Sequence, residues 1–540
     1  MSEAAPPESF TGAERDALRS YFTELDGPVF ALVNLPEVVK GALFARYSRS
    51  AKSLRRLFLD EFAGRVADAP PPPVAVGVER AEQLFERVFV EYGDDSVAQL
   101  GSVHLACENV SNVLTKVLEW GRLMAYLEQS TRYVPHTDRP EGRWRYHVPA
   151  ELGSTALREA YTTVLDDAFE TYARWLPRLE ERYAQAFPRD EATSPGVWKR
   201  SIRAKALDAL RGLLPAATLA NVGIHGTGQA YEALLLRMRA HPLAESQDLA
   251  QRMLVELRKV IPAFLRRVDV EERGVRWTRY LAETREDTGR VAAELLAGVR
   301  PASQPDVALT DFDPEGEIKV VAAALYAVSA LPDAQLVECA RAMSAEARAR
   351  VLQAYVGERG NRRHKPGRAF ERAWYRFDVL ADYGAFRDLQ RHRMLTLEWQ
   401  PLTPAHGWVA SEAVEEAGAL GDWARVMDRA GEVHDRMRDA GLGPAASYVV
   451  PMAYRIRFYM EMNAREAMHV VELRTAPQGH SSYRRVCQMM HRRIAEDAGH
   501  RAIADTMRFA DHGAVGLERL EAERSAERRN SARALPDEFR

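Results

Sequence analysis

The sequence is poor in cysteine, in long apolar runs and in excess charge of one sign. Its 540 residues include three cysteines, Cys107, Cys339 and Cys487. Because these are few and far apart, neither a disulfide framework nor a cysteine metal site is expected. No uncharged apolar run reaches the roughly 18 residues of a membrane span, and the N-terminus lacks a basic start followed by an apolar core. We therefore expect a cytoplasmic protein without a membrane partner.

The charge balance also argues against a dedicated nucleic-acid binder. The chain has 74 basic and 77 acidic side chains, a net charge of -3. A specific nucleic-acid partner is therefore not expected, although local basic clusters suit a nucleotide. Hydrophobic content of 46% and charged content of 28% describe a soluble globular protein. At about 150 residues per domain, the length predicts two to four units.

Helical periodicity dominates the chain, so we predict an α+β, helix-dominated fold. Helical patterns cover about residues 14–61, 155–186, 199–240, 244–268, 332–355, 411–440, 454–476 and 482–509. Short strands are expected near 143–148 and 374–379. The run Pro70–Pro73 predicts a stiff linker, and the proline-containing stretch 298–316 predicts a second one without helical period.

The densest group of basic residues is Arg391, His392 and Arg393, followed about seventy residues later by the segment NAREAMHVVELR. Guanidinium groups are planar, permanently charged donors that suit a phosphate, a carboxylate or an electron-rich ring. Three basic residues alone are more typical of a solvated surface. The rest of the chain must decide between the two interpretations.

These two segments together resemble the motifs of the flavin-dependent thymidylate synthases (ThyX). That family has RHR, a short spacer, E-x-S-x-R-Y, and later N-x-R with an arginine on the same helix. Here E-x-S-x-R-Y does not follow Arg393, but it occurs in the first half as EQSTRY, Glu128–Tyr133. When the two halves are superposed by their motifs, Trp120-Gly121-Arg122 falls on RHR. A second anchor agrees, because Asn463 follows Pro451 at the same spacing as Thr227 follows Pro215.

The resemblance implies two diverged ThyX-like units in tandem, each with helices around a small antiparallel sheet. We predict an N-terminal helical extension and linker at 1–75, a first unit at 76–297, a linker at 298–316, a second unit at 317–515 and a charged tail at 516–540. The two units are called the first and second repeat below.

The family motifs divide between the repeats instead of decaying at random. The second repeat keeps Arg391, His392, Arg393, Asn463, Arg465 and Arg474. The first repeat has Trp120, Gly121, Arg122, Thr227, Gln229 and Met238 there, so only Arg122 survives. Conversely, the first repeat keeps Glu128, Ser130, Arg132 and the pre-proline Arg211, whereas the second has Trp399, Pro401, Thr403 and Ser447. In the family, different chains supply these two groups to a shared site. One composite active site and one vestigial site are therefore predicted.

The resemblance also implies ligands and roles. The dUMP site would comprise Glu128, Ser130, Arg132, Arg211, Arg474 and, where the family usually has glutamine, Asp388. Arg474 would be the catalytic residue, because it would stabilise negative charge on the uracil. FAD would contact Arg391, His392, Arg393, Asn463, Arg465 and His469. NADPH and methylenetetrahydrofolate would be co-substrates, and a tandem chain would form a homodimer equivalent to the family's tetramer.

Alternatives stay open at each of these positions. The carboxylate of Asp388 would suit a pyrimidine-nucleotide hydroxymethylase, and loss of turnover would leave a flavin- or nucleotide-binding regulator. Ser130 would serve equally as a turn residue, Arg474 as a favourable charge at a helix C-terminus, and His469 as a packed histidine.

Two further patterns are assigned no ligand. His480, His491 and His500 lack the carboxylate or cysteine spacing of a metal site, so no metal is predicted. The run GIHGTG at 223–228 lacks the Lys-Ser/Thr of a phosphate loop and is interpreted as the start of a helix.

Overall fold

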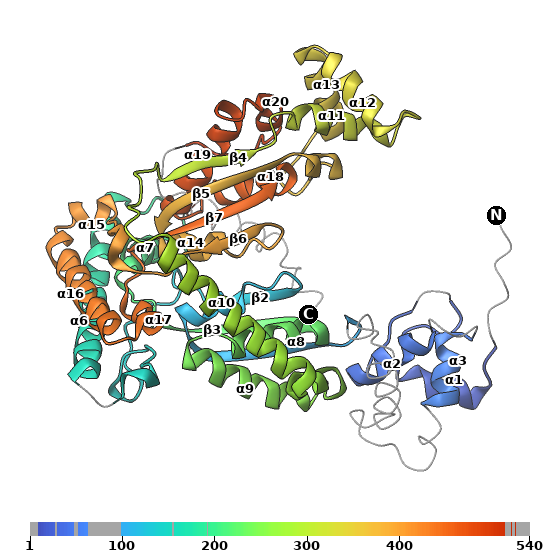
Figure 1. Cartoon of the computed structure of the whole chain (residues 1–540), viewed down its shortest axis with the longest axis horizontal. Helices are drawn as coiled ribbons and strands as arrows, with labels where there is room; N and C mark the ends of the chain where they lie inside the picture. The colour runs from blue at the N-terminus through green and yellow to red at the C-terminus, as the bar shows by residue number, and fades with distance from the viewer. Residues whose placement is uncertain are drawn as a thin grey trace. The chain divides into compact units, whose positions relative to one another are not determined.

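The computed structural model describes residues 9–27, 30–47, 52–62, 99–153, 156–191, 193–513, 520 and 524. The predicted linker Pro70–Pro73 and nearly all of the charged tail lie outside these residues. Among the described residues, helices dominate and the strands form two small antiparallel sheets, which confirms the α+β class (Figure 1). None of the described helices is long and apolar enough to cross a membrane.

The chain divides into two units, each of which packs mainly against itself. The first contains Met1–Glu108, Gly121–Glu128 and Asn221–Val299, and the second contains Asn109–Trp120, Gln129–Ala220 and Arg300–Arg540. Segments of the first repeat thus contribute to both units. The repeat boundaries, which concern the sequence, stay predictions.

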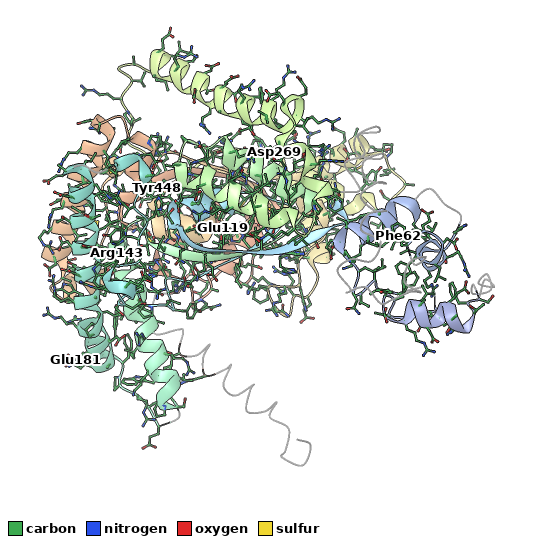
Figure 2. All side chains as sticks on the ribbon, turned by 90° about the horizontal axis from the view of Figure 1, so that it is seen from below. Phe62, Glu119, Arg143, Glu181, Asp269 and Tyr448 are labelled. Carbon is green, nitrogen blue, oxygen red and sulfur yellow. The ribbon has the colours of Figure 1, made fainter. Side chains whose placement is uncertain are left out.

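The first compact unit begins with three short helices, α1 (Gly12–Arg19), α2 (Glu37–Tyr47) and α3 (Leu54–Glu61). A three-stranded sheet in the order β1-β3-β2 follows, formed by β1 (Ser102–Ser111), β2 (Met124–Glu128) and β3 (Leu219–Thr227). The helices that follow the sheet are α8 (Gly228–Arg239), α9 (Ala244–Arg258) and α10 (Arg276–Leu295). Asp269, labelled in Figure 2, ends the 3₁₀ turn after α9 and pairs with Arg239 at 2.7 Å.

The second compact unit is built around a four-stranded sheet in the order β4-β5-β7-β6. Its strands are β4 (Val307–Phe312), β5 (Trp374–Asp382), β6 (Thr396–Trp399) and β7 (Arg455–Asn463). Its helices are α5 (Asn112–Leu118), α6 (Ala156–Ala186), α7 (Pro195–Leu210), α11 (Gly316–Tyr326), α12 (Asp333–Ala342), α13 (Ala345–Val356), α14 (Tyr383–Leu389), α15 (Glu412–Glu416), α16 (Leu420–Asp439), α17 (Gly443–Ala446), α18 (Ala464–Arg474), α19 (Ser481–Glu496) and α20 (Arg501–Asp505).

The elements of the two repeats correspond one to one around the motifs. Helices α5 and α14 have the same length, and the superposition that places Trp120 on Arg391 also places the first residue of α5 on the first residue of α14. The strand–helix pairs β3–α8 and β7–α18 change from strand to helix at Thr227 and Asn463, the two residues that the second anchor makes equivalent. Both residues cap the following helix with their side chains. The tandem architecture is therefore present in the backbone.

Equivalent residues of the two repeats also pair with each other inside the second unit. Pro215 forms an antiparallel bridge with Pro451, its own counterpart. On one side of this bridge the backbone N–H of Ala216 donates to Val450, and on the other side that of Met452 donates to Leu214. Such reciprocal bonds are the mark of a two-fold relation between the repeats.

Several sequence predictions need correction. The predicted helix 199–240 is interrupted by strand β3, and the predicted helix 454–476 begins as strand β7. The side chains of β7 alternate between buried and half-buried, a period-two pattern of Ile456, Phe458, Met460 and Met462 that indicates a strand. Likewise, GIHGTG is mostly the end of β3, and α8 begins only at its last residue.

Of the two predicted strands and the second predicted linker, one strand is confirmed and the other two predictions are corrected. The strand expected near 374–379 is confirmed as β5. The one expected near 143–148 is reduced to a single bridge between Tyr146 and Thr218. The predicted linker at 298–316 contains strand β4, which pairs with β5 along the edge of the sheet. β4 has six residues and lies at the edge of the sheet, so its sequence shows little of the alternation that identifies a strand.

Candidate functional site

Several residues of the predicted composite site lie close together inside the second compact unit, around Asp388. This residue lies near the end of α14. Arg211, from the first repeat, approaches Asp388 Oδ2 through Nη1 at 3.2 Å. Arg474, the last residue of α18 in the second repeat, approaches Oδ1 through Nη1 at 3.7 Å. All three side chains are at most 14% exposed. Arginines from the two repeats of one chain thus share a single buried carboxylate.

Arg132 joins this group through an aromatic side chain. Its Nε and Nη2 bind Asp208 at 2.7 and 2.6 Å, and its Nη1 donates to the Tyr483 hydroxyl at 3.0 Å. The Tyr483 ring lies under two guanidinium groups, 5.4 Å from that of Arg474 and 5.9 Å from that of Arg132. Both distances are in the range of a cation–π contact. Tyr483, from α19, therefore connects the arginines of the two repeats.

The cluster contains more guanidinium groups than carboxylates. Burial alone would raise the pKa of Asp388, but the neighbouring guanidinium charges outweigh it and hold that pKa well below its usual range. In decreasing order of effect these charges are Arg211, Arg474, Arg391 and Arg132. In addition, the buried Nη2 of Arg211 has no hydrogen-bond partner among the described residues. An excess of buried donors over acceptors is the signature of an anion site.

Ser130 has a local role in the structure. Its hydroxyl accepts the backbone N–H of Arg132 at 3.2 Å, the turn geometry that serine commonly adopts. This bond fixes the loop from which the Arg132 side chain reaches Asp208. The acidic residue of the same motif, Glu128, is the final residue of β2 in the first compact unit, where it is buried and pairs with Val222.

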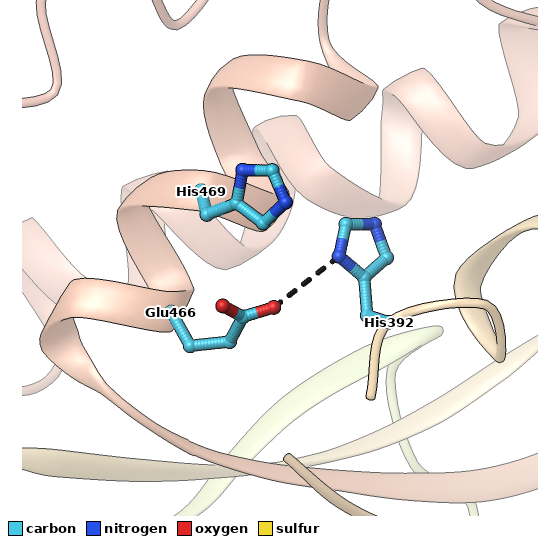
Figure 3. A group of neighbouring side chains, drawn as sticks. All are labelled: His392, Glu466 and His469. Carbon is cyan, nitrogen blue, oxygen red and sulfur yellow. Dashed lines mark hydrogen bonds and ion pairs between the residues drawn. The ribbon is translucent and has the colours of Figure 1, made fainter. Parts of the chain in front are cut away.

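A second group of motif residues lies where α18 meets the loop after α14 (Figure 3). His392 Nε2 accepts from Nε of Arg474 at 2.9 Å, and His392 Nδ1 lies 3.3 Å from Oε1 of Glu466. The His469 ring meets the His392 ring edge to face at 5.3 Å between centroids. Burial, with nearby positive charge, lowers the pKa of His392 well below its usual value and that of His469 to about 4. Both imidazoles are therefore neutral at pH 7.

Three of the residues that the resemblance assigns to FAD carry positive charge. Arg391 and Arg393, on either side of His392, are exposed. Arg465 is half-buried, donates to the carbonyl of Pro366 at 2.9 Å and lies 3.4 Å from Glu371. Asn463 caps α18 by accepting the backbone N–H of Glu466 at 2.9 Å. Its side chain thus starts the helix that carries Arg465, His469 and Arg474.

His392, Glu466 and His469 also have the composition of a metal site, because their potential ligand atoms lie within 4.8 Å of one another. The hydrogen bonds argue against this interpretation. A guanidinium only donates, so the bond from Arg474 requires a lone pair on His392 Nε2. The proton of the neutral ring is then on Nδ1, directed at Glu466, and the nitrogen nearest the other two side chains has no lone pair to offer.

Three residues of the cluster were missed by the sequence analysis: Asp208, Glu466 and Tyr483. None belongs to a motif of the resembled family. Asp208 and Tyr483 become neighbours of Arg132 only through the packing of α7 and α19. Glu466 could have been predicted from the sequence, because it lies three positions before His469 and eight before Arg474 on one predicted helix.

Comparisons with known proteins identify the family of this chain. The model of a family described as thymidylate synthase complementing protein matches residues 44–263 and 308–498, that is, once in each repeat. The chain belongs to this family. The two matches confirm the tandem of two ThyX-like units that the motifs predicted.

Relatives of the chain include proteins that match it over nearly their whole length. A UPF0159 protein of Chlamydia pneumoniae is 36% identical over 522 residues, covering 96% of this chain and 98% of the relative. A UPF0159 protein of Thermoplasma acidophilum is 31% identical and covers 90% and 97%. A flavin-dependent thymidylate synthase of Clostridium tetani is 26% identical over 187 residues, covering 34% of this chain and 69% of the relative. Among solved structures, the UMP/dUMP methylase PolB from Streptomyces cacaoi, bound with 5-Br dUMP, has a TM-score of 0.30 and 20% identity, covering 39% and 99%.

Proposed function

We propose that this protein converts dUMP to dTMP at one composite site, with FAD as cofactor and methylenetetrahydrofolate and NADPH as co-substrates. In the balanced reaction, dUMP, methylenetetrahydrofolate, NADPH and a proton give dTMP, tetrahydrofolate and NADP⁺. The observation that carries the proposal is the meeting of Arg211 and Arg132 with Arg474 around one buried carboxylate. Family membership supports the same reaction class.

The nucleotide phosphate suits the side of the cluster supplied by the first repeat. A phosphate dianion prefers guanidinium donors and short hydroxyl donors, which Arg132, Arg211 and Ser130 offer. The unpaired buried Nη2 of Arg211 supports this assignment, since a bound anion would supply its missing acceptor. Asp388 is ionised beside these arginines and offers acceptors only, so any bond it makes to the nucleotide comes from an N–H or O–H of the base or sugar. Glu128 belongs to the proposed set by resemblance alone.

The uracil ring would lie near Arg474. Substitution at C5 of uracil requires electron density at that carbon, which builds negative charge on the ring oxygens and N3. A guanidinium held in place before the reaction stabilises such charge without reorganisation. A hydrogen bond to His392 and an ion pair with Asp388 hold Arg474 in this way, and the Tyr483 ring lies beneath it. Arg474 is therefore the proposed catalytic residue.

FAD fits the residues around His392. Its pyrophosphate carries negative charge, and the donors Arg391, Arg393 and Arg465 are positive at any working pH. The neutral imidazole of His469 and the amide of Asn463 suit uncharged ring edges. Both ring nitrogens of His392 are already bonded to Arg474 and Glu466, so His392 belongs to the FAD set by resemblance alone. When bound, the flavin supplies the reducing equivalents for the transferred one-carbon unit. The proposed assembly is a homodimer with two composite sites.

Asp388 favours one alternative, a flavin-dependent pyrimidine-nucleotide hydroxymethylase, because its carboxylate only accepts hydrogen bonds, whereas the usual glutamine can also donate them. A non-catalytic flavin- or nucleotide-binding regulator is the other. Purified protein would be tested for bound flavin by its spectrum, and for dTMP formed from dUMP, methylenetetrahydrofolate and NADPH. A yellow protein that forms dTMP supports the proposal. Hydroxymethyl product favours the first alternative, and a spectrum that shifts with dUMP without turnover favours the regulator.

A further inference from the structure

We infer that Glu466 is a positioning residue for Arg474 and that it acts through His392. Nothing in the family motifs assigns this residue, and the inference rests on the proposed function in that Arg474 is the proposed catalytic group. The three side chains form a continuous chain of hydrogen bonds from the first turn of α18 to its last residue. Figure 3 shows the first of these bonds, between Glu466 and His392.

Among the described residues, no hydrogen bond or ion pair joins Glu466 directly to Arg474. Their separation of eight positions on one helix corresponds to about 12 Å along the axis. His392, from the loop after α14, lies between the two side chains and bonds to both. Its Nδ1 is 3.3 Å from Glu466, and its Nε2 is 2.9 Å from Arg474. Its side chain is only 3% exposed, and that of Glu466 is 10% exposed. Solvent therefore has little access to replace either bond.

The direction of each bond follows from the donors available. Arg474 has no acceptor, so His392 must present a lone pair at Nε2 and carry its proton on Nδ1. Glu466 as a carboxylate offers acceptors only, so it favours this tautomer over the other. With the proton on Nε2, two N–H groups would face each other across 2.9 Å and the bond to Arg474 would be lost.

Glutamine at position 466 is the diagnostic substitution. Its amide is nearly isosteric with the carboxylate but can donate as well as accept, so it no longer discriminates between the two tautomers of His392. The backbone N–H of residue 466, which Asn463 caps, is unchanged by the substitution. Loss of stability should therefore be small, and the effect should appear in the position of Arg474.

The expected loss of kcat is moderate. An aspartate that fixes a histidine tautomer in serine proteases contributes about 10⁴-fold. Here Asp388 and Tyr483 still hold Arg474 when His392 does not. We therefore expect Glu466→Gln to lower kcat about ten- to a hundredfold, with KM for dUMP changed less than about threefold, because His392 and Glu466 are not assigned to the phosphate. Glu466→Asp, which still only accepts, should retain more activity than Glu466→Gln.

The experiment combines kinetics with two readouts that need no turnover. The histidine tautomers would be read by ¹⁵N NMR of histidine-labelled protein, with His392 assigned by a His392→Gln sample, and the Arg474 side chain by crystallography of Glu466→Gln. Glu461→Gln is the matched control, since Glu461 pairs with Arg376 on the sheet surface, away from the cluster. It should leave every readout unchanged.

The outcomes separate the inference from the proposed function. A wild-type protein without turnover, in which His392 carries its proton on Nδ1 and Glu466→Gln displaces Arg474, supports the inference while the function fails. Unchanged kcat in Glu466→Gln, or a wild-type His392 with its proton on Nε2, overturns the inference. Loss of activity in chelator, restored by a divalent metal, also overturns it, because a metal would then occupy the place of the Nδ1 proton.

Discussion

Replacing Asp388 by asparagine removes the one carboxylate that Arg211 and Arg474 share. At an effective dielectric of about 20, a unit charge pair at the 3.2 Å of Asp388 and Arg211 is worth about 5 kcal/mol before desolvation. Breaking a buried pair from one side costs about 3–5 kcal/mol. Asparagine keeps one oxygen acceptor, so we expect the lower figure, about 3 kcal/mol of unfolding free energy. That corresponds to a change of about 150-fold in the unfolding equilibrium constant.

A bound dianion should reverse about half of this loss. In the wild type, the phosphate of dUMP enters a cluster that already contains a negative charge, whereas in Asp388→Asn it supplies the missing one. We expect dUMP to bind the variant at least about tenfold more tightly, which is about 1.4 kcal/mol. At a fixed dUMP concentration above both dissociation constants, the stability gap between the two proteins narrows by that amount.

Urea unfolding with and without dUMP measures both effects, with affinity determined separately by calorimetry. Asp378→Asn is the matched control, because Asp378 pairs with Arg457 at 2.7 Å on the more exposed sheet surface. Its loss should stay below about 1 kcal/mol and should not respond to dUMP. An Asp388→Asn protein as stable as the wild type, or a gap that widens with dUMP, would refute the reasoning.

The pH dependence of this gap has a defined sign. The arginine charges lower the folded pKa of Asp388, so its stabilisation is complete above the unfolded pKa of about 3.9. It is lost as the pH falls below that value toward the folded pKa. Wild type and Asp388→Asn should therefore converge in acid.

The remaining predictions concern single residues. Arg474→Ala and Arg132→Ala should each abolish dTMP formation. Arg122→Ala, at the position predicted to be vestigial, should change kcat less than about twofold. Equal losses of activity in all three variants would contradict a single composite site. Tyr483→Phe removes the acceptor of the 3.0 Å bond from Arg132 but keeps the ring, so the free energy of unfolding should fall by about 1 kcal/mol and KM for dUMP should rise about fivefold. An unaltered KM would exclude this role. Burial and nearby positive charge lower the pKa of His480 to about 4, below its unfolded value near 6.5. Unfolding free energy should therefore fall as the pH drops from about 6.5 to about 4, because the unfolded chain binds the proton more tightly. His480→Asn, which retains a cap for α19, should flatten that slope in urea titrations, and an equally steep slope would show that other groups cause it.

The sequence predicted the tandem repeat and the residues of the candidate site more accurately than it predicted the strands. Motif spacing alone located the superposition of the halves, which reappears in the bounds of α5 and α14. Arg211 and Arg474 were assigned to one site, and they share Asp388. The ligand roles of these residues stay predictions.

The two strands that were predicted as helix, β3 and β7, were missed for one physical reason. β3 and β7 each run directly into a helix with no loop between them, since Thr227 and Asn463 end the strand and cap the helix at once. Without a proline or a loop to separate them, apolar residues at period two merge with those at period 3.6. Asp208 and Tyr483 were missed for another reason. Their contacts with Arg132 depend on tertiary packing between segments far apart in the sequence, which local patterns do not encode.

The two repeats are joined by main-chain hydrogen bonds. Motif side chains can therefore be replaced in one repeat without separating it from the other. The N–H of Ala216 donates to Val450, and that of Met452 donates to Leu214. Each repeat also docks its short helix in the same way. The N–H of Asn112, which begins α5, donates to Thr218, and that of Tyr383, which begins α14, donates to Tyr454, the equivalent pair of the second repeat. Backbone bonds of this kind tolerate almost any side chain. Threonine, glutamine and methionine can therefore stand at the positions predicted to be vestigial without removing the main-chain bonds that join the two repeats.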